Sequence, residues 1–287
     1  MIRPAPTLGL AAIFAALIGA SPAPADTGAD VLSIGGAVTE IIVALGQGHR
    51  LKARDTTSSY PPEVTELPDV GYMRALSPEG VLSVDPSLII TGEGAGPPEA
   101  LEVIRAADVA LVEVPDARDA DGILRKIEII GDALGVPERA DLLQADVGAA
   151  LAEATRAAER PEADKKRVLF ILSTQGGRIT ASGAGTEADA VIRMAGGVNA
   201  VTDFEGYRQL TDEAVGLAAP DVILMMDRGG DHGKSDAELL ALPAVALTPA
   251  AERASIVRMN GLLLLGFGPR TAEAVTRLSR AIYDGGS

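Results

Sequence analysis

The feature that most constrains the fold is an internal repeat of a helix-to-strand pattern, with the two copies 134 residues apart. One copy covers residues 76–81 and runs on to 85–90, and the other covers 210–215 and runs on to 219–224. In each copy, a hydroxyl residue suited to cap a short helix is followed by a proline and an apolar run typical of a buried strand. The repeat predicts an α/β fold of two similar lobes. A chance echo of a common pattern is the alternative.

The segment between the copies, residues 121–160, has apolar residues at helical spacing and predicts a nearly continuous helix. The Gly135-Val136-Pro137 tripeptide is expected to break or kink it. A long helix between two lobes acts as a stiff connection rather than a flexible hinge. We therefore divide the chain into an N-terminal lobe (26–120), a linking helix (121–160) and a C-terminal lobe (161–287).

Strands and helices alternate along both predicted lobes, which favours parallel sheets flanked by helices on both faces. The expected strands are 31–34, 88–91, 110–114, 168–172, 222–226 and 256–259. The expected helices include 40–45, 98–107, 187–195, 237–240 and 271–283. Ligands of such folds bind at the carboxyl ends of the strands, so we expect a ligand cleft between the lobes.

Residues 1–25 have the features of a cleavable signal peptide. Arg3 precedes an uncharged stretch of 13 residues, 8–20, which is too short to span a bilayer, and Ala23-Pro24-Ala25 suits cleavage after Ala25. No cysteine follows the apolar stretch, so a lipid anchor is not expected. These features predict a soluble exported protein located in the periplasm.

Composition narrows the function further. The formal net charge is −15, which argues against nucleic-acid binding. The chain has no cysteine and two histidines, so disulfides, iron–sulfur clusters and thiol nucleophiles are excluded and histidine acid–base chemistry has little scope. A binding protein without catalytic activity fits this composition better than an enzyme, and we expect the protein to be a monomer.

A tyrosine and an arginine, Tyr72 and Arg74, lie just before the first copy of the repeat. A tyrosine ionises near pH ~10 and binds metal at neutral pH only when its phenolate is stabilised. If this segment is extended, residues i and i+2 point to the same side, so Arg74 would lie beside the Tyr72 oxygen. Tyrosinate is an axial ligand of haem iron in some proteins. The alternative is an ordinary loop tyrosine beside a solvated arginine.

The glycine-rich segment 229–235 suggests a phosphate-binding loop, but Arg228 occupies the position where that motif requires glycine. We reject that interpretation and treat Arg228, directly after a predicted strand, as a residue at the edge of the cleft.

Four stretches of the chain resemble the periplasmic haem-binding components of bacterial haem ABC importers, relatives of the cobalamin- and siderophore-binding proteins. They are LPDVGYMRALSPEGVLSVDPSLII, GTEADAVIRMAGGVNAVTDFEGY, APDVILMMDRG and GLLLLGFGPRT, and the resemblance covers essentially the whole chain after the signal peptide. It implies two lobes joined by a rigid backbone helix. It also implies that Tyr72 is the axial iron ligand of bound haem and that Arg74 supports its phenolate.

The resemblance further implies partners. One acidic residue per lobe, Glu79 and Glu213, would dock on the inner-membrane ABC permease and ATPase complex, and an outer-membrane haem receptor would supply haem indirectly. A simpler role for both glutamates is to complement a helix dipole. Arg228, Tyr207 and Arg178 are expected to approach the porphyrin or its propionates from the second lobe. The alternative ligand is a siderophore or cobalamin.

Some family members add a histidine from the second lobe, near the segment that here reads Ser173-Thr174-Gln175-Gly176. This chain has no histidine there. The sequence therefore gives no support for a second haem or for a histidine–tyrosine ligand pair.

Overall fold

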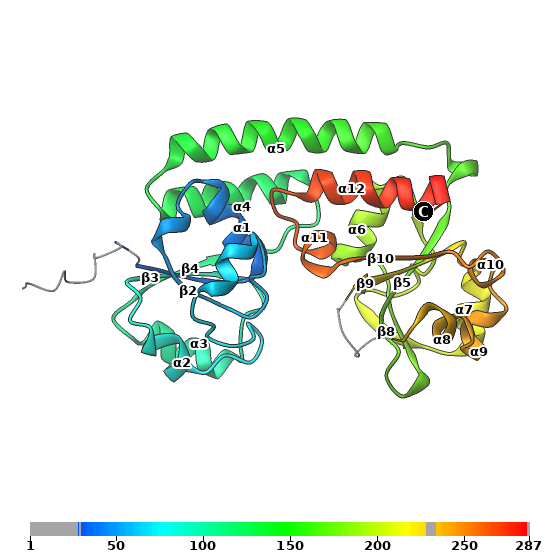
Figure 1. Cartoon of the computed structure of the whole chain (residues 1–287), viewed down its shortest axis with the longest axis horizontal. Helices are drawn as coiled ribbons and strands as arrows, with labels where there is room; N and C mark the ends of the chain where they lie inside the picture. The colour runs from blue at the N-terminus through cyan, green and yellow to red at the C-terminus, as the bar shows by residue number, and fades with distance from the viewer. Residues whose placement is uncertain (1–27, 29, 228–233, 286–287) are drawn as a thin grey trace, which may run out of the picture.

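The computed structural model describes residues 28, 30–227 and 234–285 (Figure 1). The predicted signal peptide and Arg228 lie outside the described residues. Within the described part of the chain, no helix combines the length and the apolar character needed to cross a membrane.

The N-terminal lobe is built on a four-stranded sheet in which every neighbouring pair is parallel, as predicted. Its strands, in spatial order, are β2 (Leu51–Arg54), β1 (Val31–Ile34), β3 (Leu88–Gly92) and β4 (Ala110–Val114). Its helices are α1 (Gly36–Ala44), α2 (Pro78–Ser83) and α3 (Pro98–Arg105). Strands β1 and β3 are mostly apolar and buried along nearly their whole length, as expected for parallel strands that are covered on both faces.

The C-terminal lobe is built on a six-stranded sheet. Five strands follow the order β10 (Ile256–Asn260), β9 (Val222–Asp227), β5 (Arg167–Ser173), β6 (Ile179–Ser182) and β8 (Tyr207–Leu210), and β7 (Val198–Asn199) also pairs with β5. Its helices are α6 (Glu187–Met194), α7 (Asp212–Ala218), α8 (Asp236–Leu240), α9 (Pro243–Ala246), α10 (Pro249–Glu252), α11 (Gly261–Leu265) and α12 (Thr271–Arg280).

The expectation of a wholly parallel sheet is wrong for one strand of this lobe. Strand β6 runs antiparallel to both β5 and β8. Only a short turn around Gln175–Gly177 joins β5 to β6. A parallel crossover needs a dozen or more residues, so a connection this short can only return the chain antiparallel.

The predicted linking helix is two helices, α4 (Ala120–Ala133) and α5 (Pro137–Ala158), which pack against each other. The break falls at Gly135, whose φ is +70°, a conformation that glycine adopts without strain. A Cβ atom built on Gly131 would come within 2.4 Å of the Ala140 Cβ, so the two helices are in close contact. With 22 residues, α5 is about 33 Å long and runs along both lobes in Figure 1.

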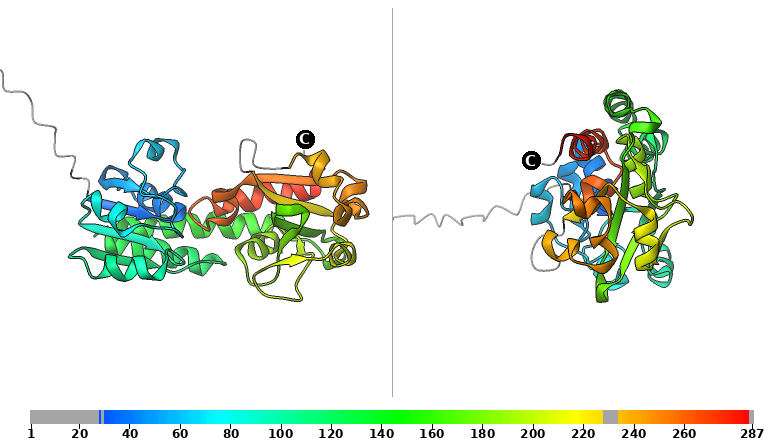
Figure 2. Two further views of the ribbon diagram at one scale, coloured as in Figure 1. Left: turned by 90° about the horizontal axis from the view of Figure 1, so that it is seen from below. Right: turned by 90° about the vertical axis from the view of Figure 1, so that its right-hand side faces the viewer.

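Helix α5 packs against α4 and against α12, and the end-on view in Figure 2 places α5 and α12 on the same side of the molecule. A single hydrophobic cluster runs through this layer from lobe to lobe, with Ile41, Ile127, Leu151, Phe170 and Leu278 among its members. Each sheet has a separate second cluster on its other face. The lobes therefore share a core, which makes their connection rigid.

An ion pair and a stacked ring join the lobes beside this core. Arg270, at the start of α12, donates from Nε to the Glu40 carboxylate of α1 at 3.1 Å. The Arg270 guanidinium also lies 3.4 Å from the centre of the Tyr60 ring. Burial raises the pKa of the Glu40 carboxyl, and Arg270 opposes that effect.

The predicted repeat is present in the structure. The Ser77 hydroxyl accepts a hydrogen bond from the Gly80 N–H, and the Thr211 hydroxyl accepts one from the Ala214 N–H, so both helices have the predicted cap. After each helix the residue before the proline has a positive φ, 49° at Asp85 and 42° at Ala219. Each proline then leads into a central strand, β3 or β9, so the two copies build the same unit in each lobe.

Candidate ligand-binding site

Tyr72 lies on the connection between β2 and α2, and its side chain is 46% exposed. The Ala75 N–H donates to the Tyr72 carbonyl at 2.8 Å, which closes a turn over Tyr72–Ala75. This segment is therefore not extended, and the alternation expected to place Arg74 beside the Tyr72 oxygen does not apply. Among the described residues, no hydrogen bond joins the Tyr72 and Arg74 side chains. The turn leaves the phenol accessible.

Backbone hydrogen bonds fix the Tyr72 turn from two sides. On one side, the Thr56 N–H donates to the Gly71 carbonyl at 3.0 Å. On the other, the Gly96 N–H donates to the Met73 carbonyl, and the Leu76 N–H donates to the Gly96 carbonyl, both at 2.8 Å. The turn is thus held between the loops that follow β2 and β3, at the carboxyl end of the sheet.

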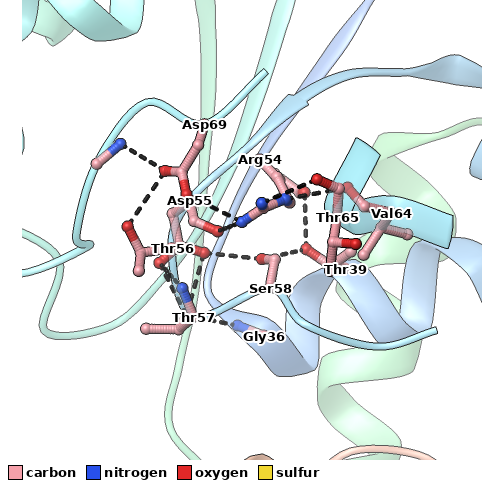
Figure 3. Close-up of polar contacts among 12 residues, drawn as sticks. Gly36, Thr39, Arg54, Asp55, Thr56, Thr57, Ser58, Val64, Thr65 and Asp69 are labelled. Carbon is pink, nitrogen blue, oxygen red and sulfur yellow. Dashed lines mark hydrogen bonds and ion pairs between the residues drawn. The ribbon is translucent and has the colours of Figure 1, made fainter. Parts of the chain in front are cut away.

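A buried aspartate organises the first of these loops (Figure 3). The Asp55 carboxylate, fully buried directly after β2, accepts hydrogen bonds from the Gly35 N–H at 2.9 Å and the Ser58 hydroxyl at 2.7 Å. It also accepts bonds from the N–H and hydroxyl of Thr57. Because Gly35 caps α1, the carboxylate lies at the positive end of that helix, where a negative charge is favoured.

A second aspartate ties the same loop to the Tyr72 turn. The Asp69 carboxylate accepts bonds from the Gly71 N–H at 2.8 Å and the Thr56 hydroxyl at 3.2 Å, and it pairs with Arg54 at 3.1 Å. The Arg54 guanidinium also donates to the Val64 and Thr65 carbonyls. The position of Tyr72 is therefore set by a polar network rather than by local sequence alone.

The C-terminal lobe contributes a second tyrosine, Tyr207, at the start of β8. Its ring packs edge-on against Phe170, with the ring centres 6.4 Å apart. Burial raises the pKa of Tyr207 to about 12, Glu187 adds to this, and Thr186, Arg74 and Arg118 oppose it. Tyr207 is therefore a neutral phenol, suited to hydrogen bonding rather than to metal ligation. The charge of Arg74, from the first lobe, reaches this second-lobe tyrosine.

Three charged side chains, Arg74 and Arg118 of the first lobe and Glu187 of the second, act on Tyr207, and through Glu187 they join a larger charged set. We call this set the interlobe polar cluster; its members are Arg74, Glu93, Asp116, Arg118, Lys126, Glu187 and Tyr207, which act on one another electrostatically. Burial raises the pKa of Asp116 and lowers the pKa of Lys126. Arg118 and Glu187 join the two lobes directly, with Nε and Oε1 3.1 Å apart.

The cluster lies where this type of fold binds ligands. Glu93 follows β3, and Asp116 and Arg118 follow β4, so all three come from the carboxyl ends of parallel strands. The Asp116 N–H donates to the Glu93 carboxylate at 2.8 Å, which joins the two loops. Glu187 opens α6, where Thr186 caps the helix by accepting from the Asp189 N–H.

The other predicted site residues lie away from the interlobe polar cluster or outside the described part of the chain. Arg178 is exposed at the end of the turn between β5 and β6, and no described contact brings it to the cluster. Arg228 lies outside the described residues. Glu79 and Glu213 are exposed in the first turns of α2 and α7, away from the polar cluster.

Sequence reasoning missed Asp55, Arg118 and Glu187. The polar run Asp55-Thr56-Thr57-Ser58 directly after a short strand was an available signal for Asp55. Nothing in the sequence pairs Arg118 with Glu187, because 68 residues separate them and only the packing of the lobes brings them together.

Comparison with known proteins places this arrangement in a family. The chain is 40% identical to the periplasmic haem-binding protein RhuT from Roseiflexus sp. RS-1; the match covers 89% of this chain and 98% of that one, with a TM-score of 0.85. It is 28% identical to the ABC transporter substrate-binding lipoprotein YvrC of Bacillus subtilis, over 85% of this chain and 77% of that protein. It is 25% identical to the vitamin B12-binding protein of Vibrio cholerae, over 90% of both chains.

A family model described as periplasmic binding protein matches residues 31–261, which include both sheets, the linking helices and the whole interlobe polar cluster. With that match, and with RhuT aligned over nearly its full length, this chain belongs to the periplasmic binding protein family.

Proposed function

We propose that this protein binds ferric haem between its lobes and delivers it to an ABC permease for iron uptake. The observation that carries the proposal is the match to a haem-binding protein at 40% identity with both lobes aligned, in a chain that exposes a tyrosine at the carboxyl end of its first sheet. The protein acts as a carrier and not as an enzyme.

Tyr72 is the proposed iron ligand. Its ring is accessible, and a polar network fixes the turn that carries it, so a phenolate oxygen is presented with little loss of conformational freedom on binding. Arg74, two residues along the same turn, is the proposed partner of that phenolate in the haem complex. Tyr207 remains protonated and hydrogen-bonds or packs against the ligand from the second lobe. Arg178 and Arg228 are further candidates for propionate contacts.

Cobalamin is the alternative ligand, and the similarity to the Vibrio cholerae protein supports it. A corrin supplies its own cobalt and carries uncharged amide groups, so it needs neither a tyrosinate nor cationic side chains. A siderophore is a further alternative of the same transporter class.

Adding haem to the purified, signal-free protein tests the proposal. We expect a high-spin ferric spectrum typical of tyrosinate ligation and saturation with increasing haem. A matched titration with cyanocobalamin is the control, since it is a metal-containing macrocycle without carboxylates. Binding of cyanocobalamin together with an unchanged haem spectrum would overturn the proposal in favour of the alternative.

Glu79 and Glu213 are the proposed contacts with the permease. Both are exposed, both stand at the second position of a capped helix, and the two helices are the matching units of the repeat. One acidic residue is thus presented by each lobe. Replacing both with alanine should abolish haem uptake by cells while haem affinity stays at the wild-type value. Loss of haem affinity would instead place the two glutamates in the binding site.

Residues 1–25 are proposed to direct export to the periplasm, with cleavage after Ala25. The matched relatives include periplasmic proteins and a lipoprotein. The mass of the mature protein, measured after expression with its own leader, tests the cleavage position.

A further inference from the structure

Arg118 and Glu187 form an ion pair that bridges the two lobes within the interlobe polar cluster. Arg118 comes from the loop between β4 and α4, and Glu187 is the first residue of α6. Arg118 Nε donates to Glu187 Oε1 at 3.1 Å. The Arg118 side chain is 53% exposed and that of Glu187 is 24% exposed, so the pair can be reached from solvent.

The three cations of the cluster differ in what they can offer a ligand. Lys126 is buried, and its ammonium donates to the Gly266 carbonyl at 3.4 Å. Arg74 lies on the turn that carries Tyr72 and is the proposed support of the Tyr72 phenolate. Arg118 is the cation of the cluster that makes an ion pair to the opposite lobe. A group bound to Arg118 would therefore lie at the junction of the two lobes, beside Glu187.

Arg118 has spare capacity for hydrogen bonding. A guanidinium carries five N–H donors in a planar fork, and in the described structure Glu187 takes one of them. The remaining N–H groups can donate to a second carboxylate in a bidentate arrangement, the geometry in which arginine binds carboxylates most strongly.

Releasing Glu187 costs little. The pair is partly exposed, 53% at Arg118 and 24% at Glu187, and ion pairs that water can reach contribute little net stability. Glu187 also stands in the first turn of α6, where the helix dipole favours a negative charge with or without Arg118. Glu187 thus competes with a ligand carboxylate for Arg118, and its own negative charge stays stabilised by the helix when Arg118 is released.

We propose that Arg118 is the receptor for a ligand carboxylate, and that Glu187 holds its guanidinium in place until that carboxylate replaces it. This inference rests on the proposed function, because it assigns the group that recognises a propionate of haem. It makes the interlobe polar cluster selective for macrocycles that carry carboxylates over macrocycles whose side chains are esters or amides.

The test compares haem with its dimethyl ester, in which both carboxylates are uncharged. We expect R118Q to lower the affinity for haem about 10-fold, the loss typical of one charge-assisted hydrogen-bonded pair, and to leave the affinity for the ester unchanged. E187Q should raise the affinity for haem several-fold, since it removes a carboxylate that competes with the propionate for Arg118 and also repels the propionate. A gain in affinity cannot arise from a misfolded protein.

The N-terminal lobe, which also carries Arg118, contains a second arginine–glutamate ion pair that serves as a matched control. Arg105 and Glu113 form an exposed arginine–glutamate ion pair, with both side chains 48% exposed, outside the cluster. R105Q and E113Q should bind haem and its ester as the wild type does.

Three outcomes separate the two proposals. The role of Arg118 is overturned if R118Q binds haem as tightly as the wild type does. It is also overturned if neither R118Q nor E187Q changes the ratio of haem affinity to ester affinity. In both cases the haem proposal stands. Failure of the wild type to bind haem overturns the proposed function itself. A haem-to-ester ratio that falls in R118Q and rises in E187Q supports the inference.

Discussion

Two Gly-Tyr pairs precede the two copies of the repeated unit, and the fold uses their tyrosines differently. Gly71 and Gly206 both have positive φ, +99° and +77°, so each pair begins at a similar bend. Tyr72 then enters an exposed turn, whereas Tyr207 enters strand β8 and packs edge-on against Phe170. The same dipeptide thus gives an accessible phenol in one lobe and a half-buried one in the other.

The two tyrosines differ because the segments that follow them differ in length by one residue and because only the second segment pairs with a neighbouring strand. Four residues separate Tyr72 from the Ser77 cap, and three separate Tyr207 from the Thr211 cap. The shorter segment pairs with β6 along its whole length, while the longer one closes a turn between two loops. The one-residue difference in segment length therefore accompanies the change from a tyrosine in a paired strand to a tyrosine in an exposed turn.

The largest expected effect comes from exchanging the two phenols for phenyl rings. Y72F should remove the tyrosinate spectrum of the haem complex and lower haem affinity more than about 100-fold, since loss of a ligand exceeds loss of a residue that only supports one. Y207F should keep the spectrum, because a phenol that stays protonated is not the ligand. A tyrosinate spectrum that survives in Y72F and disappears in Y207F would reverse the comparison.

The hydrogen-bond networks next to the two tyrosines are expected to differ in their contribution to the free energy of unfolding. D55A leaves several buried donors beside α1 without an acceptor and should lower the free energy of unfolding by about 3 kcal/mol. T186A removes the cap of α6 next to Tyr207 and should cost about 1 kcal/mol.

Urea unfolding followed by circular dichroism measures both, with the exposed D132A as a control expected to lie within about 0.5 kcal/mol of wild type. A loss for D55A no larger than that for D132A would mean that Asp55 does not organise the Tyr72 side of the molecule.

The smallest effect concerns ionisation of Tyr207. Its pKa is raised to about 12, above the ordinary value of 10.0, so the native state binds this proton more tightly than the unfolded state. The stability that Tyr207 contributes is therefore present below pH 10 and is lost as the pH rises toward 12.

At pH 11, unfolding wild-type protein in urea should release about one more tyrosinate, measured by its ultraviolet absorbance, than unfolding Y207F. Equal increases in the two proteins would show that Tyr207 is not protected, and the contrast with Tyr72 would then fail.

Much of the architecture was predictable from sequence because it depends on strong local patterns. All six predicted strands exist: β1, β3, β5 and β9 are mostly buried apolar runs inside their sheets, and β4 and β10 are partly exposed strands at the sheet edges. Strands β2, β6, β7 and β8 were not predicted. They are short or carry polar residues, and it is pairing with a neighbouring strand that keeps them extended.

The candidate site was predictable only in part. Tyr72 and Arg74 stand out because aromatic residues are scarce and the two lie close together in sequence, but their predicted side-by-side geometry was wrong. The turn that replaces it depends on Thr56 and Gly96, which are remote in sequence from each other.

The sequence by itself determined the two-lobed α/β plan and the repeated capped helix before each central strand, because caps, periodic apolar residues and prolines act over a few residues. Only the tertiary structure decided that residues 121–160 fold back as two helices, that β6 reverses, and that Arg118 meets Glu187 across the lobes. These features arise from packing between segments far apart in the chain, and no local pattern encodes which of those segments will meet.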